Sequence, residues 1–418
     1  MAFQYPSGLR ALNHRDYRLF FFGQLISLVG TWMQTVGQSW LIVKLTDSAL
    51  LLSLISTLQF LPQLLFSLFG GALADRLPKR KTIIFTQSTM MLLAFALSAL
   101  VYTGTVRYWH VAVLATLLGL ANSLDMPVRQ AFTVEMVGGK EDLGNAIALN
   151  SAMFNGARLL GPAAAGLLVA RYGVGLAFFI NGVSFIAVLI ALLQMTALGL
   201  PKPRAKKSII ADIKDGLVYV YKTPMVFFLI SLLLGIGLFV INYSVLVTVL
   251  AKSVLGKGAQ EYGILMSSLG AGALVGAVIL AMRGRHVTRP DLRPLITSGL
   301  VLCTVTTLMF FVRLYPLACL GLFAMGLSQI LYTADTNTML QVIVPDELRG
   351  RVMSVYQLVF AGSTPIGSLF TGAVIERWGG SAGFLADGGM GLLSAVALVA
   401  WWVFRRKRDP EESRAAEA

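Results

Sequence analysis

The fold is decided first by residues 50–81, LLLSLISTLQFLPQLLFSLFGGALADRLPKRK. The first part of this stretch, Leu50–Ala74, is an apolar run without a charged side chain. A run of about 20 apolar residues is long enough to cross the hydrocarbon core of a membrane as a helix. The run ends at one carboxylate, Asp75, which is followed closely by four Lys or Arg residues. We therefore predict a membrane-spanning helix that leads into a short basic turn.

Similar apolar runs recur along the chain, for example at Thr82–Tyr102 and Asp387–Phe404. Of the 418 residues, 56% are hydrophobic and only 13% are charged, and the mean hydropathy is +0.75. A soluble domain needs more charged residues to cover its surface. The sequence predicts an all-α membrane protein with twelve transmembrane helices, not an enzyme. The first run, Leu19–Val43, exceeds the apolar region of about 7–15 residues in a signal peptide, so we expect it to be a span.

The net charge of +14 is explained by where the basic residues lie. If the amino terminus is inside and every span changes sides, most Lys and Arg residues fall in inside segments. The outside segments hold Lys44, Arg107, Arg171, Lys252, Lys257, Arg313 and Arg377. This distribution follows the positive-inside rule. We predict a multi-pass protein of the bacterial inner membrane with both termini in the cytoplasm, and no nucleic-acid partner.

The chain contains an internal repeat that predicts two similar halves. Gly119-Leu120 and Arg171-Tyr172-Gly173 correspond to Gly326-Leu327 and Arg377-Trp378-Gly379. Two parallel halves with a site near the midplane are a recurrent plan of transporters. We predict two pseudo-symmetric six-helix bundles, 1–200 and 224–418, the second with a basic cytoplasmic tail. Residues 201–223 form a cytoplasmic central loop, whose Ser208–Lys222 stretch is either an amphipathic helix on the membrane surface or a simple tether.

The basic turn carries the most specific motif, Gly71-Ala72-Leu73-Ala74-Asp75-Arg76-Leu77-Pro78-Lys79-Arg80-Lys81. It resembles the loop signature between helices 2 and 3 of the major facilitator superfamily, with Pro78 where the family usually has Gly. The resemblance covers nearly the whole chain and implies a transporter of small molecules. It also implies a cytoplasmic gate. The gate residues expected on this basis are Gly71, Asp75, Arg76, Lys79 and Arg80, and we expect Glu135 to join their network.

A second motif, Asn155–Gly166, lies in the fifth span. Its small residues allow close helix packing, and its proline weakens one helical turn. It resembles the helix-5 motif of the superfamily's antiporters, and this resemblance implies export. The motif residues in this chain are Gly156, Gly161, Pro162 and Gly166. Leu12–Arg18 and Gly30-Thr31-Trp32 resemble the enterobactin-exporter and macrolide-efflux branch of drug:proton antiporters. Many members of that branch have Asp at the place of Thr31, so one candidate proton carrier is missing here.

Ionisable residues inside membrane spans are costly and therefore functional candidates. Asp125 and Arg158 fall at similar depth in the fourth and fifth spans, and Asp335 corresponds to Asp125 in the tenth. We predict that Asp125 pairs with Arg158. The pair is either a protonation switch or a static structural ion pair.

Polar and aromatic side chains inside spans are the candidates for a substrate cavity. Taken singly, each such residue more often serves contacts between helices than ligand binding. The cavity candidates are Gln34, Gln38, Gln59, Asn242 and Phe239. No nucleotide-binding Gly-Lys loop, no nucleophile beside a base and no Cys/His metal pattern is present in the sequence, so neither cofactor nor metal is expected.

The predicted function is secondary active transport, most simply proton-coupled export of a small amphipathic compound such as a drug or siderophore by alternating access. A resemblance of this kind implies a monomer in contact with membrane lipids. Two alternatives on the same fold are an uptake permease and a lysophospholipid flippase. A membrane sensor or scaffold without transport is an alternative of another class, although a scaffold does not need buried charges.

Overall fold

The computed structural model describes residues 5–139, 141–200, 209–283 and 291–408. Within these ranges the side chains of residues 7, 67–75, 209–213, 346, 406 and 407 are not described. The described residues form helices and short connections, without a strand among them. The all-helical prediction is confirmed.

Twelve helical segments of the described chain are long and apolar enough to cross a membrane. The first six are α1 (Arg15–Thr46), α2 (Ala49–Arg76), α3 (Lys79–Tyr102), α4 (Tyr108–Met136), α5 (Leu143–Tyr172) and α6 (Val174–Gln194). The others are α8 (Pro224–Phe239) continued by α9 (Tyr243–Val249) and η2 (Leu250–Val254), α10 (Ala259–Arg283), α11 (Arg293–Leu308) with η3 (Met309–Phe311), α12 (Tyr315–Ile343), α13 (Asp346–Trp378) and α14 (Gly380–Arg408). Two further helices, η1 (Ser7–Asn13) and α7 (Ile209–Lys222), are too short to span.

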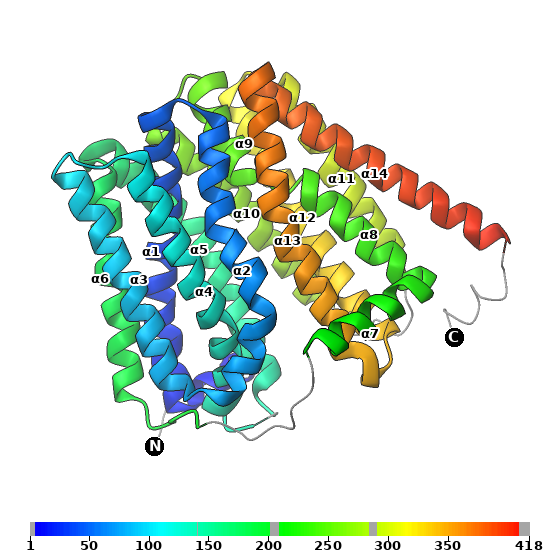
Figure 1. Ribbon diagram of the computed structural model, residues 1–418, viewed down its shortest axis with the longest axis horizontal. Coiled ribbons are helices and arrows are strands. Elements are labelled where there is room, and N and C mark those ends of the chain that lie inside the picture. The colour runs from blue at the N-terminus through cyan, green and yellow to red at the C-terminus, as the bar shows by residue number, and fades with distance from the viewer. Residues whose placement is uncertain (1–4, 140, 201–208, 284–290, 409–418) are drawn as a thin grey trace. The chain divides into compact units, whose positions relative to one another are not determined.

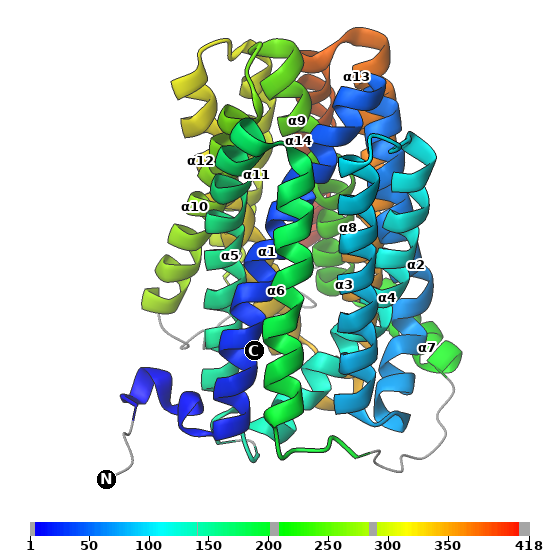
Figure 2. The ribbon, with the colours of Figure 1, turned by 90° about the vertical axis from the view of Figure 1, so that its left-hand side faces the viewer.

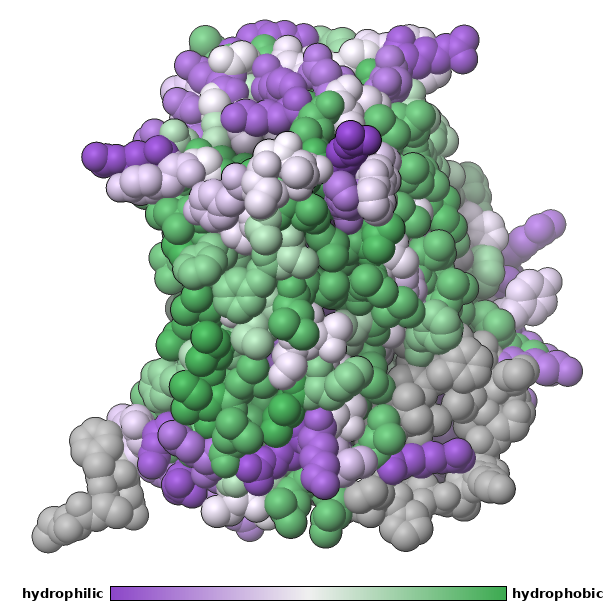
Figure 3. Space-filling model, turned by 60° about the vertical axis from the view of Figure 1, so that its left-hand side comes forward, coloured by the Kyte–Doolittle hydropathy of each residue, from purple (hydrophilic) through white to green (hydrophobic). Residues whose placement is uncertain are grey.

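The surface agrees with a membrane environment. Large apolar side chains stay exposed along many helices, among them Phe85 at 67%, Leu92 at 63% and Leu393 at 67%. On the face drawn in Figure 3, hydrophobic residues form a broad band, and hydrophilic residues gather at both ends. Helices that are apolar all round are typical of membrane spans.

The chain divides into two compact units. Unit 1 comprises Met1–Asp47, Leu58–Lys206 and Lys257–Ser267; unit 2 comprises Ser48–Thr57, Lys207–Gly256 and Ser268–Ala418. The first part of α2 therefore belongs to unit 2, and the first part of α10 belongs to unit 1.

In unit 1, α6 packs against both α1 and α3, and α5 packs on α1 (Figures 1 and 2). Small residues make these contacts close. A Cβ atom on Gly23 of α1 would lie 3.0 Å from the Ala187 carbonyl oxygen of α6. Because apolar burial gives little driving force in lipid, such close van der Waals packing holds membrane helices together.

In unit 2, α11 packs against α12 and α14, and α8 packs against α13 and α14. The span that starts with α8 is interrupted after Phe239 and resumes at Tyr243. The short helix α7 packs on α13 through Gly216, which faces the Arg351 carbonyl, and through an Asp215–Arg351 ion pair of 3.1 Å. The predicted amphipathic stretch is thus a helix, and its Leu217 and Tyr221 side chains are exposed.

Candidate functional site

A polar cavity lies inside unit 1. Three of the five predicted cavity residues line it: Gln34, Gln38 and Gln59. The remaining lining residues are Gln24, Ser27, Leu28, Thr31, Thr35, Gln87, Met90, Leu118, Asn122, Arg129, Asn181 and Phe185. Its volume is about 80 Å³. That is room for several water molecules and less than the roughly 300–1,000 Å³ of a pocket that encloses a drug-sized ligand.

Part of the polar lining of this cavity is paired within the protein. Gln38 donates to the Gln59 side-chain oxygen at 3.1 Å, and Asn181 donates to the Gln34 side-chain oxygen at 2.6 Å. Other lining atoms are buried without a hydrogen-bond partner among the described residues, namely Gln24 Oε1, Ser27 Oγ and Gln87 Oε1. Buried polar atoms are rarely left unsatisfied, so these three mark places for water or ligand atoms.

A fully buried carboxylate, Asp125 of α4, stands behind the cavity wall. Its Oδ1 atom accepts hydrogen bonds from Thr86 at 2.6 Å and from Gln87 at 3.0 Å. Its Oδ2 atom forms an ion pair of 2.7 Å with Arg129, one turn along the same helix. Because Gln87 and Arg129 both line the cavity, this network joins the carboxylate to the cavity.

The predicted pairing of Asp125 with Arg158 is wrong. Asp125 and Arg129 are four residues apart and lie on one face of α4, so the carboxylate forms its ion pair within its own helix. The Arg158 guanidinium instead lies over the Trp32 ring, 5.9 Å from its centroid. This is cation–π distance.

Asp335 of α12 has a looser environment in unit 2. Its nearest described cation is Arg283, with 4.0 Å between the charged atoms. Both side chains are partly exposed, at 23% and 51%. The Asp335 Oδ2 atom is buried without a hydrogen bond to a described residue, and a cation 4.0 Å away compensates it less than Arg129 compensates Asp125 at 2.7 Å.

The basic end of unit 1 contains the residues of the loop motif that the structure describes. Lys79 is almost completely buried, and its Nζ atom lies 2.9 Å from Glu135 and 3.2 Å from the Leu200 carbonyl oxygen. Arg80 donates to the carbonyl oxygens of Leu192 and Leu193. Glu135 therefore does join this loop, as expected. Arg76 is exposed, and Gly71 and Asp75 lie outside the described side chains.

Removal of the Glu135 charge is expected to destabilise the basic end. Glu135→Gln leaves the buried Lys79 ammonium without its carboxylate, and breaking a buried pair costs about 3–5 kcal/mol. Glu135 is 20% exposed, so we expect a loss below that range. The melting temperature in detergent measures it. Lys79→Met combined with Glu135→Gln should recover part of the loss, and a double variant no better than Glu135→Gln would contradict the pairing.

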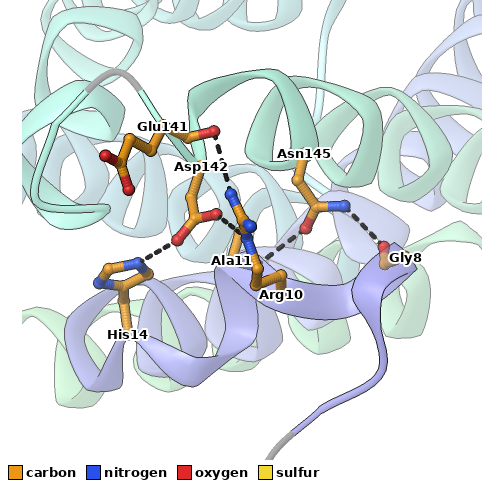
Figure 4. A network of polar contacts seen from close by, with 7 residues as sticks. All are labelled: Gly8, Arg10, Ala11, His14, Glu141, Asp142 and Asn145. Carbon is orange, nitrogen blue, oxygen red and sulfur yellow. Dashed lines mark hydrogen bonds and ion pairs between the residues drawn. The ribbon is translucent and has the colours of Figure 1, made fainter.

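The amino-terminal segment η1 is held on α5 by a network that sequence reasoning missed (Figure 4). Asp142 accepts from Arg10 and lies 2.8 Å from His14 Nε2. Asn145 donates to the Gly8 carbonyl at 2.7 Å and accepts from the Ala11 amide at 2.9 Å. The partners are more than 120 residues apart in the chain, so no local sequence pattern predicts these contacts.

Docking of η1 is expected to depend on the charge of Asp142. The hydrogen bonds from His14 and then Arg10 hold the pKa of Asp142 below its ordinary value of 3.8. A lowered carboxyl pKa gives stability that is complete above the ordinary value and is lost as the pH falls through the docked value. At neutral pH, Asp142→Asn should therefore speed hydrogen exchange in residues 8–14, and Glu141→Gln, which retains the main-chain contact to Arg10, should not. Equal exchange in both variants would contradict this assignment.

Comparison with known proteins agrees with this helical architecture and its motifs. The model of the family "Transmembrane secretion effector" matches residues 6–416. The chain belongs to this family of the major facilitator superfamily. Its members are transporters rather than enzymes, so this chain is a multi-pass membrane transporter.

Two relatives resemble this transporter over most of its length. The multidrug efflux pump Tap of Mycolicibacterium fortuitum is 27% identical, and the match covers 88% of this chain and 91% of Tap. The enterobactin exporter EntS of Shigella boydii is 25% identical, covering 95% and 94% of the two chains. The resemblance found in the sequence is thereby confirmed. The crystal structure of the nucleoside transporter NupG has the same fold, with a TM-score of 0.72 at 14% identity, covering 94% of this chain and 99% of NupG.

The helix-5 motif of this major facilitator protein acts in packing. A Cβ atom on Gly161 would collide with Trp32 of α1, and Gly166 faces the Gly263 backbone of α10, where a Cβ atom would lie at 3.0 Å. Apart from its own helical turn, no described residue has an atom within 4 Å of the Cβ position of Gly156. The motif therefore brings α5 close to α1 and to the part of α10 that belongs to unit 1, and Pro162 is buried in the same stretch of α5.

The two remaining cavity candidates of the transporter, Phe239 and Asn242, lie in unit 2 at the interruption between α8 and α9. Phe239 packs edge-on against Phe370, with the ring centroids 5.3 Å apart. Asn242 lies beside a second fully buried carboxylate, Asp387 of α14. We missed Asp387 because it opens an apolar run, where we took it for the start of the span.

Proposed function

We propose that this transporter exports a small amphipathic compound, such as a drug or siderophore, in exchange for protons across the bacterial inner membrane. The observation that carries the proposal is the Asp125–Arg129 ion pair at the wall of a polar cavity. The pair combines a group that can bind a proton with a cation that faces the cavity.

Proton binding to Asp125 removes the negative charge that holds Arg129. The Arg129 guanidinium is then an unpaired cation beside the cavity, where it favours water or polar ligand atoms over an apolar group. In the ionised state the pair is neutral as a whole, and the cavity wall is less polar. The apolar part of a substrate therefore binds better when Asp125 is ionised than when Asp125 carries a proton. Binding of the proton and binding of the substrate oppose each other, which is the requirement for exchange.

The cavity lining supports an amphipathic substrate. Amide and hydroxyl groups of Gln24, Ser27 and Gln87 face it, and apolar side chains of Leu28, Met90, Leu118 and Phe185 complete it. The cavity is smaller than a drug-sized ligand, so alternating access must enlarge it. Export is supported by the names of the relatives, an efflux pump and an exporter. An uptake permease and a lysophospholipid flippase remain the alternatives on this fold, and a sensor without transport the alternative of another class.

The same proposal places both termini in the cytoplasm and treats the basic end of unit 1 as the cytoplasmic gate. The buried Lys79–Glu135 pair supports it, because breaking such a pair is costly and can hold one conformation. We further propose that the protein works as a monomer surrounded by lipid.

The test uses inside-out membrane vesicles with an acid interior and a pH-sensitive dye. Macrolides, dyes, siderophores and lysophospholipids are added one at a time to vesicles with and without the protein. A compound that dissipates the pH gradient only when the protein is present supports proton-coupled export. If the folded protein gives no dissipation with any compound, exchange of these compounds for protons is wrong.

A further inference from the structure

Asp387 is a carboxyl group that the proposed exchange at Asp125 does not use. It lies seven residues into α14, which places it about 10 Å along the helix from its first residue. Its side chain is completely buried in unit 2, where α14 packs against α8, α11 and α13. A carboxyl group in this position is costly unless a cation or a proton neutralises it.

The hydrogen bonds around Asp387 leave room for a proton on its carboxyl group. Thr371 of α13 can donate its hydrogen to the Gly367 carbonyl oxygen at 2.9 Å or to Asp387 Oδ2 at 2.6 Å. A hydroxyl group has one hydrogen. If that hydrogen goes to the carbonyl, the hydrogen in the contact with Asp387 must come from the carboxyl group. The second carboxyl oxygen, Oδ1, has no partner in the part of the chain that the structure describes.

Among the described residues, no charged group compensates Asp387. The carboxyl group is buried beside the Thr371 hydroxyl and the Asn242 amide. No described Lys, Arg, His or second carboxylate interacts with it electrostatically. From α11, the Cys303 thiol lies near Gly391, one turn further along α14. Asp125 has the opposite environment, since Arg129 is in contact with it. An ionised Asp387 is therefore disfavoured, and the neutral acid fits the site.

The backbone brings these groups together at the interruption between α8 and α9. Asn242 donates to the Leu238 carbonyl oxygen at 2.9 Å, and Ser368 of α13 lies 3.5 Å from the Asn242 side-chain oxygen. A Cβ atom on Gly367 of α13 would collide with the Leu238 carbonyl oxygen, so glycine is required for the close approach of α13 to the end of α8. Interrupted membrane helices occur where they line functional sites, and they are places where a helix can change direction.

We propose that Asp387, with Thr371 and Asn242, is a second proton-binding site of this protein, located in unit 2. In the present conformation the proton resides on the carboxyl group and is donated to Thr371 Oγ1. When a change at the α8–α9 interruption admits water, the proton leaves Oδ2 for water, and the Thr371 hydroxyl hydrogen turns from the Gly367 carbonyl to the carboxylate. The role of this site in transport rests on the proposed function; its proton occupancy does not.

The test is infrared difference spectroscopy of the purified full chain at neutral pH, without substrate. A protonated carboxyl group has a C=O band that ionised carboxylates lack. We expect this band in the wild type, its loss in Asp387→Asn and its retention in Asp335→Asn. Thr371→Val should shift the band because its hydrogen bond is lost, which decides the matter if Asp387→Asn does not fold. A carboxyl band that is absent from the wild type, or that neither Asp387→Asn nor Thr371→Val changes, would overturn the proposal.

The transport consequence is tested separately in liposomes. Asp387→Asn is expected to lose accumulation driven by a pH gradient and to keep substrate exchange in the absence of a gradient. If the wild type is not driven by a pH gradient, the proposed function fails, whereas the infrared result still decides whether Asp387 holds a proton. Full pH-driven accumulation in a folded Asp387→Asn protein would remove Asp387 from coupling.

Discussion

The Asp125→Asn variant is expected to lose pH-driven transport completely while it still exchanges substrate down its gradient. The amide has the size of the carboxyl group and can still accept from Thr86, so the packing at this buried position is retained. It cannot release or bind a proton, and it does not neutralise Arg129. The measurement compares substrate flux into inside-out vesicles with and without a pH gradient, at equal protein amounts.

Arg129→Gln and Arg158→Gln form a matched pair for this prediction. Arg129 contacts Asp125, whereas Arg158 lies over Trp32. Arg129→Gln should lower the ratio of pH-driven to downhill flux, because it removes the cation that pairs with Asp125 at the cavity. Arg158→Gln should leave that ratio unchanged. If Arg158→Gln lowers the ratio and Arg129→Gln does not, the assignment of the partner is wrong. pH-driven flux in Asp125→Asn would exclude this carboxylate as the coupling group.

Gly161→Ala in the helix-5 motif is expected to destabilise the protein clearly. The added Cβ atom would lie 2.9 Å from the Val29 carbonyl oxygen and collide with Trp32, so α1 and α5 must separate. Overpacking of this kind costs about 1–3 kcal/mol, against at most about 1 kcal/mol gained from helix propensity. The melting temperature of the protein in mild detergent should fall.

Gly156→Ala is the control, because it changes the same motif in the same helix. Outside its own helical turn, no atom of the described residues lies within 4 Å of its added Cβ atom, so only the gain in helix propensity remains. Its melting temperature should equal or exceed that of the wild type. Equal losses for the two variants would mean that the motif acts through helix flexibility rather than through packing against α1.

The fold could be predicted from the sequence because a lipid environment places a simple requirement on each membrane span. Each span must satisfy its own backbone hydrogen bonds and be apolar over about 20 residues, so hydropathy alone locates the helices. The interruption after Phe239 was not predicted, since Val240 and Ile241 are as apolar as the helices around them and Asn242 alone does not mark a break.

Contacts between side chains were predictable only where the chain itself brings them together. The Asp125–Arg129 pair follows from four-residue spacing on one helix, and we overlooked it in favour of a partner on another helix. Contacts such as Thr371 with Asp387 depend on how helices rotate against one another, which hydropathy does not determine. Gln34, Gln38 and Gln59 were found because amide groups in a span are uncommon enough to single out.

The most direct test of proton-coupled export is made with the purified protein in liposomes that carry only a pH gradient. With a compound identified in the vesicle panel, the wild type should accumulate it against its concentration gradient on the acidic side, and an ionophore that dissipates the pH gradient should release it. Accumulation that persists after the pH gradient is dissipated, or flux that never exceeds equilibration, would contradict the proposed proton coupling.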